Sequence, residues 1–231
     1  MRALALALLA SPAMADAELY AADNVLATFY HELGHAIVDL GLLPVLGQEE
    51  DAADALSVVL IDSAFDEEDA LALMGSVVDM WAVSAAEGAP VYHGAHDPDI
   101  RRRFSHICLF AGADLEARGD WAVDSGLPEE RLEACEEEFA LAAESWGAVL
   151  DEMAGRGGMT FEMRAEGAAA RLAGEVLAAE VAALNDELAL PRPLSVAVEA
   201  CGEQNAFYDP AGPEIVVCAE YAAWFLETAP N

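Results

Sequence analysis

The residues with the clearest chemical potential in this sequence form the segment His31-Glu32-Leu33-Gly34-His35. Two histidines four residues apart project from one face of a helix, where their imidazoles can bind one zinc ion. The glutamate beside them is placed to take a proton from a zinc-bound water. The alternatives are a chance match, a structural zinc site, or two surface histidines on a helix.

The flanking residues predict the helix that this chemistry requires. Apolar residues recur there at helical spacing: Val25, Phe29, Ala36 and Leu40. Asp23 or Asn24 can cap the start of this helix, and Gly41 can end it. A helix this apolar is expected to be buried in a core, which argues against the alternative of two surface histidines.

Composition limits the partners of the chain. There are ten basic residues, all arginine, against 43 acidic ones, which gives a formal net charge of −33. A surface of this charge repels nucleic acid and anionic lipid. We therefore expect no nucleic-acid partner. Because 55% of the 231 residues are hydrophobic, a sizeable core can form.

The N-terminus predicts a signal peptide. Arg2 is the positive region, an apolar run follows it, and Ala13-Met14-Ala15 is an A-x-A cleavage site. The apolar run is too short to span a bilayer. We expect residues 1–15 to be removed, leaving an exported protein, periplasmic or secreted, without stable insertion in a membrane.

Cys108, Cys135, Cys201 and Cys218 are an even number of cysteines in a chain expected to be exported. Such a count predicts two disulfides, for which three pairings exist. We favour the local pairing, Cys108 with Cys135 and Cys201 with Cys218, because each pair would join neighbouring elements. No C-x-x-C spacing suggests a cysteine zinc site, and buried free thiols are the other alternative.

The remaining pattern predicts a mainly α fold with a small β-hairpin or sheet, in a single domain of residues 16–231. Helical spacing covers residues 48–62, 66–87, 101–112, 128–153, 168–190 and 219–226. A short strand is expected at 160–164, and a hairpin from strands 194–201 and 214–218.

Two histidines and a water leave zinc one protein ligand short, and a glutamate on the next helix commonly supplies it. The first turn of helix 48–62 carries Glu49, Glu50 and Asp51. Favourable interaction with the helix dipole is the simpler explanation of these acids. Glu50 and Asp54 lie four residues apart, on one face of this helix.

The loop at 88–99 carries candidates for stabilising an oxyanion, which peptide hydrolysis requires. His96 is the preferred donor, and Tyr92 or Tyr208 are the alternatives. His93 is more simply a solvated loop residue, and His106 a core or edge residue of its helix.

Four separated segments resemble a family of exported bacterial proteins assigned as metallopeptidases. They are Tyr30–His35, Leu43–Asp54, Arg102 to Cys108, and Cys201–Pro210 with Cys218. The resemblance covers most of the mature chain. It implies one zinc ion and a zincin-like fold, although the expected strands follow the zinc helices here, whereas zincins usually place the sheet first.

The E-x-x-x-D spacing of Glu50 and Asp54 is similar to that of the gluzincin metallopeptidases, of which thermolysin is a member. This similarity implies that Glu50 is the third zinc ligand and that Asp54 orients His31 or His35. Glu49 is the rival for the ligand position. The metzincin pattern needs glycine and histidine where Val38 and Gly41 stand, so that class is excluded.

These residues together predict a zinc peptidase that acts on a peptide or protein substrate, with Glu32 as the general base. A non-catalytic zinc-binding or interaction protein on the same scaffold is the main alternative. A zinc amidase acting on cell-wall material is a further one. The sequence sets neither the oligomeric state nor the cleavage preference.

Overall fold

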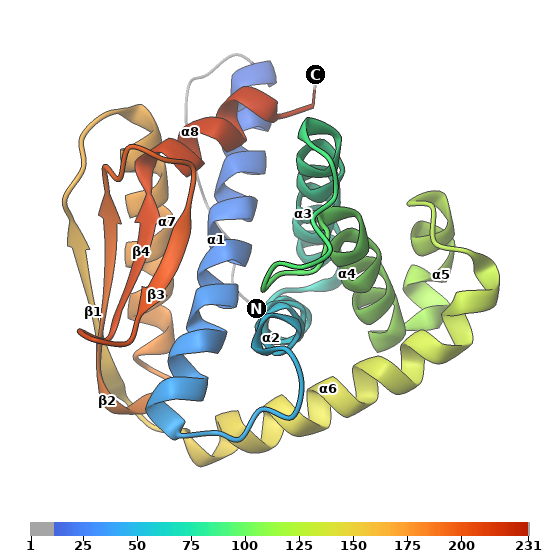
Figure 1. Cartoon of the computed structure of the whole chain (residues 1–231), viewed down its shortest axis with the longest axis horizontal. Coiled ribbons are helices and arrows are strands. Elements are labelled where there is room, and N and C mark those ends of the chain that lie inside the picture. The colour runs from blue at the N-terminus through green and yellow to red at the C-terminus, as the bar shows by residue number, and fades with distance from the viewer. Residues whose placement is uncertain (1–11, 231) are drawn as a thin grey trace. The chain divides into compact units, whose positions relative to one another are not determined.

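The structure is a computed structural model that describes residues 12–230 (Figure 1). Contacts among these residues divide the chain into two compact units. Residues 47–149 form what we call the helical unit, and residues 12–46 and 150–230 form the sheet unit. Of the expected signal peptide, residues 1–11 lie outside the described part, and residues 12–15 belong to the first helix.

The helical unit contains the helices predicted at 48–62, 66–87, 101–112 and 128–153, and one that the sequence did not suggest. The elements are α2 (Glu49–Ala64), α3 (Glu67–Glu87), α4 (Asp99–Ala113), α5 (Leu115–Asp124), η1 (Glu129–Arg131) and α6 (Leu132–Glu152), whose last residues are counted with the sheet unit. The unexpected helix is α5, for which the Asp114 side chain caps the start by accepting from the Ala117 amide. Its ten residues are too few to show a clear apolar period.

Helix α3 forms much of the core of the helical unit. Asp66 caps it by accepting from the Asp69 amide, and it packs on α4 and α2. Its inner face is apolar and buried: Ala70, Leu73, Met74, Val77, Val78, Met80 and Trp81. By length and composition alone α3 could also cross a membrane, a test that buried core helices also pass.

Arg118 of α5 ties several of these helices together. Its buried guanidinium donates to Asp62 at the end of α2 and to Glu67 at the start of α3, at 2.6 and 2.7 Å. It also donates to the Phe110 carbonyl of α4. Because these partners come from three helices, Arg118 fixes the end of α2 opposite to the one that carries Glu50.

Helices α4 and α6 approach closely at Gly112. The Cys108–Cys135 disulfide joins them, as the sequence led us to expect. A β-carbon added at Gly112 would overlap the carbonyl oxygen of Cys135, which is backbone and cannot rotate away. Only glycine therefore fits at this position.

Gly112→Ala is expected to lower the free energy of unfolding by more than about 2 kcal/mol, because overpacking against backbone forces the helices apart. Denaturant unfolding measures the change. Gly75→Ala in α3 is the matched control, since nothing lies within 4 Å of the added carbon there. Relieving the glycine penalty should make that variant more stable by roughly 0.5–1 kcal/mol. Equal stability of the two variants would contradict the close approach.

The sheet unit combines a small sheet with three helices. It contains α1 (Pro12–Gly41), β1 (Gly157–Met163), α7 (Ala168–Leu184), β2 (Ala189–Glu199), β3 (Ala206–Asp209), β4 (Glu214–Cys218) and α8 (Ala219–Thr228). Within the described residues the strand order is β1-β2-β4-β3. Strands β1, β2 and β4 run parallel, and β3 is an antiparallel edge strand. The prediction of a mainly α fold with a small sheet is confirmed.

The predicted hairpin joined the wrong strands. Residues 194–199 and 214–218 are neighbours in β2 and β4, but they run parallel. The hairpin is formed by β3 and β4, and Asp209 accepts from the Ala211 amide in its turn. Phe207 and Tyr208, which lie between the two strands of the predicted hairpin and so were expected in its turn, belong to β3. Alternating apolarity identifies strands without giving their direction, which explains the error.

The segment 189–193 is also strand rather than the end of a helix. Gly157 pairs with Ala189 and Met159 with Leu194, so β2 carries extra residues between these pairs. Pro191 and Pro193, which lack an amide hydrogen, lie in this irregular stretch, where they cost no ladder hydrogen bond.

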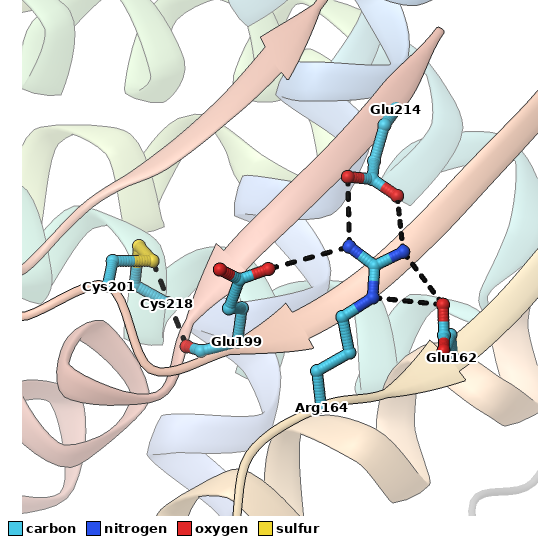
Figure 2. Close-up of polar contacts among 6 residues, drawn as sticks. All are labelled: Glu162, Arg164, Glu199, Cys201, Glu214 and Cys218. Atoms are coloured by element: carbon cyan, nitrogen blue, oxygen red, sulfur yellow. Dashed lines mark hydrogen bonds and ion pairs between the residues drawn. A yellow bond between two sulfur atoms is a disulfide. The ribbon is translucent and has the colours of Figure 1, made fainter. Parts of the chain in front are cut away.

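A polar network ties the parallel strands together at one end of the sheet (Figure 2). Arg164, just after β1, donates to Glu214 of β4 at 2.7 Å and to Glu162 of β1 at 2.7 Å. Oε2 of Glu199, in β2, lies 3.4 Å from Nη1 of Arg164. The Arg164 hydrogen bond lowers the pKa of the Glu214 carboxyl. The Cys201–Cys218 disulfide, also the expected pair, joins the residues that follow β2 to the end of β4.

Candidate metal centre

Helix α1 positions the residues of the His-Glu-x-x-His segment. It packs on α7, α8 and the sheet, and its core residues include Val25, Phe29, Leu33 and Ile37, all fully buried. This packing fixes the rotation of the helix about its axis. The direction in which His31 and His35 project is therefore set by the core of the sheet unit.

The two imidazoles lie close together. Nε2 of His31 and Nε2 of His35 are 3.2 Å apart, with the rings at 81° to each other. Two zinc–nitrogen bonds of about 2.05 Å at a tetrahedral angle place the nitrogens roughly 3.3 Å apart. The pair therefore has the separation that shared ligation of one zinc ion requires. A hydrogen bond between a donor and an acceptor tautomer has a similar length.

Glu32 lies on α1 directly beside the first of these histidines. Its side chain is buried, at 7% exposed, as is that of His31. A buried carboxylate beside two imidazoles is unusual for a packing residue, because ionised side chains are rarely buried. The sheet unit thus brings together His31, Glu32 and His35.

One turn after His35, Asp39 anchors the end of α1 to the sheet. Its carboxylate accepts from the Tyr208 hydroxyl of β3 at 2.7 Å and from Arg192 of β2 at 2.8 Å. Burial, then the hydrogen bond to Asp39, raises the pKa of the Tyr208 hydroxyl. Asp39 and Arg192 had no sequence pattern that singled them out, although Asp39 follows His31 and His35 at the same spacing of four.

In the helical unit the structure brings together Glu50 and His96. Glu50 is half-buried in the first turn of α2, whereas its rival Glu49 is exposed. Nε2 of His96, from the loop between α3 and α4, lies 2.9 Å from Oε2 of Glu50. The imidazole of His96 is 55% exposed. His96 therefore contacts the carboxylate that the sequence singled out as a ligand.

A pocket of the helical unit opens beside His96. It has a volume of about 320 Å³ and is lined by Gln48, Tyr92, Gly94, His96, Asp97, Pro98, Ile100 and Arg101. His93 is not among these lining residues. The pocket is large enough for one amino-acid side chain.

Asp54, one turn after Glu50, is held by Arg102. Arg102 Nε donates to Oδ2 at 2.9 Å and Nη2 donates to Oδ1 at 2.6 Å. Arg102 lies in α4 and also stacks on Trp81 of α3. In the sequence, Arg102 stood out only as part of a family resemblance. Its partnership with Asp54, 48 residues away, has no local signal. His106 is buried, as expected of a core residue.

A helix that carries His-Glu-x-x-His, with its imidazoles at ligand separation, is characteristic of metal-dependent hydrolases. Comparison with known families gives the same class. The model of the family described as "Putative metallopeptidase" matches residues 8–150 and 165–229. The chain belongs to this family, which implies a bound metal. No curated protein and no solved structure matches the chain.

Proposed function

We propose that the protein is a zinc-dependent peptidase in which His31, His35 and Glu50 bind one zinc ion. The observation that carries the proposal is the 3.2 Å separation of the two Nε2 atoms on α1. The donor set of two imidazoles and one carboxylate is that of catalytic zinc sites, which keep a fourth position for water or substrate. Membership of the family supports the same chemistry.

Held by these three residues, a zinc ion would supply Lewis-acid chemistry, polarising the substrate carbonyl and lowering the pKa of a water beside it. Glu32 takes a proton from the attacking water and delivers it to the leaving amine. Asp54 is the proposed acceptor for the N–H of one of the ligand imidazoles, whose orientation it would hold. The fold that serves this chemistry is proposed to be zincin-like, with the sheet following the zinc helices in the chain.

His96 is the proposed donor to the developing oxyanion. Its Nε2 faces Glu50 in this structure, so it must turn toward the substrate to act. Its place at the rim of the pocket beside Tyr92 supports this role, because a substrate side chain in the pocket would bring the carbonyl nearby. The Tyr208 hydroxyl donates to Asp39, which disfavours it as the donor.

The proposed setting is the periplasm or the extracellular medium. Two disulfides are compatible with an oxidising compartment. The net charge of −33 keeps such a protein soluble and favours cationic over anionic peptides as substrates.

Metal analysis of purified protein, combined with digestion of a peptide library, tests the proposal. We expect about one zinc ion per chain and cleavage that stops when a chelator removes it and returns when zinc is added. His31→Ala and His35→Ala should each lose the metal. A protein that binds zinc but cleaves nothing in the library would favour the non-catalytic alternative. Metal binding unchanged in both histidine variants would contradict the site.

A further inference from the structure

We propose that Arg102 is a positioning residue of the metal site, acting through Asp54. This inference rests on the proposed function, in which Asp54 hydrogen-bonds a ligand imidazole. All the contacts that support it lie within the helical unit.

The first support is the geometry of the pair. The guanidinium of Arg102 meets the carboxylate of Asp54 as a fork, with both oxygens engaged at 2.9 and 2.6 Å. Only 12% of the Arg102 side chain and 8% of the Asp54 side chain are exposed. A two-point contact of this kind fixes the plane of the carboxylate as well as its position.

The second support is that the guanidinium of Arg102 is itself held against a neighbouring helix. Its guanidinium carbon lies 3.9 Å from the centre of the Trp81 ring, which provides a flat surface on α3. The charge that meets Asp54 is therefore fixed relative to α2, α3 and α4 together.

The consequence concerns the remaining acceptor capacity of Asp54. A carboxylate has about four lone-pair sites, and Arg102 uses one on each oxygen, so its fork is compatible with a hydrogen bond from an imidazole to the same carboxylate. With its plane fixed and its charge retained, Asp54 presents these sites in a constant direction. A fixed, ionised acceptor sets the tautomer and the orientation of a ligand histidine. Lysine could supply the positive charge at position 102. It could form neither the two-point hydrogen bond to Asp54 nor the flat stacking contact with Trp81.

The experiment measures metal affinity directly. Arg102→Lys is titrated with Zn²⁺ against a chelating dye, and the absorption spectrum of bound Co²⁺ is recorded. We expect zinc affinity to fall about 10- to 100-fold, the range seen when a partner of a ligand histidine is altered. The cobalt spectrum should change as well, because the orientation of one ligand is relaxed.

Arg103→Lys is the matched control on the same helix. Arg103 donates to the backbone carbonyls of Val78 and Ser125. Among residues 12–230 no carboxylate pairs with it, so its replacement should affect unfolding but not zinc affinity. The double variant Asp54→Asn with Arg102→Lys should bind zinc no more weakly than Asp54→Asn alone, since Arg102 acts through Asp54. If circular dichroism shows Arg102→Lys to be unfolded, Trp81→Leu removes the stacking surface and keeps the charge. It should also weaken zinc binding.

The outcomes separate this inference from the function on which it rests. Zinc affinity of Arg102→Lys within twofold of wild type, while His31→Ala loses the metal, overturns the role of Arg102 and leaves the peptidase proposal standing. Additive losses in the double variant also overturn it. Wild-type zinc binding that does not depend on His31 overturns both.

Discussion

Glu32→Gln is expected to bind zinc as the wild type does and to lose peptide hydrolysis by a factor of about 10²–10⁴. Glutamine matches the shape of the buried Glu32 side chain, so the packing around it should persist. An amide cannot take a proton from the attacking water. The loss corresponds to about 3–5 kcal/mol of transition-state stabilisation.

The measurement is the cleavage rate of a library peptide at saturating zinc, together with the zinc content of the purified variant. Glu18→Gln, elsewhere on α1, is the control for removing one negative charge from this helix, and it should cleave at the wild-type rate. Thermal unfolding checks that both variants fold. Hydrolysis by Glu32→Gln at the wild-type rate would rule out Glu32 as the base.

Glu50→Gln is expected to weaken zinc binding by more than about 100-fold, whereas Glu49→Gln should leave it unchanged. A ligand contributes more than the partner of a ligand, whose loss costs about 10- to 100-fold. Glu50 is half-buried and in contact with His96, while Glu49 is exposed, and this difference is the reason for the choice. Both lie in the first turn of α2, so loss of favourable interaction with the helix dipole is similar in the two variants.

Zinc titration and the zinc content after dialysis measure the difference between these variants. Because the two positions are adjacent, an effect of net charge alone would appear in both. Weakened binding in Glu49→Gln with intact binding in Glu50→Gln would reverse the assignment. Intact binding in both would leave the pair His31 and His35 with a different third ligand.

Local patterns in the sequence were sufficient to predict the helices that carry the candidate site residues. The helix containing His31 and His35 was identified by the period of its apolar residues, because one face of a helix must be buried. The disulfide pairs followed from the closeness of the cysteines in the chain and from the expectation of export. Helix α5 was missed because it is short and its buried residues, Arg118, Gly119 and Ala122, do not form an apolar stripe.

Features that depend on distant pairing could not be predicted. Strand direction is one such feature. Strands β2 and β4 are parallel because the chain first forms β3 at the edge of the sheet, beyond β4, and then returns as β4 between β3 and β2. The ion pair between Arg102 and Asp54 is another such feature. Forty-eight residues separate the two, and no local rule connects an acid on one helix to an arginine on another. The contact between His96 and Glu50 likewise depends on the path of the loop.

The division of the chain bears on the order in which the protein can fold. The helical unit is continuous in the chain, but the sheet unit is assembled from residues 12–46 and residues 150–230. Helix α1 is made first, yet it packs on α7 and α8, which are made last. Contacts across so long a stretch of chain form slowly, because a large loop must be closed before they bring any gain. The histidine-bearing helix is therefore without its core partners until synthesis is nearly complete, and its apolar surface must be shielded until then.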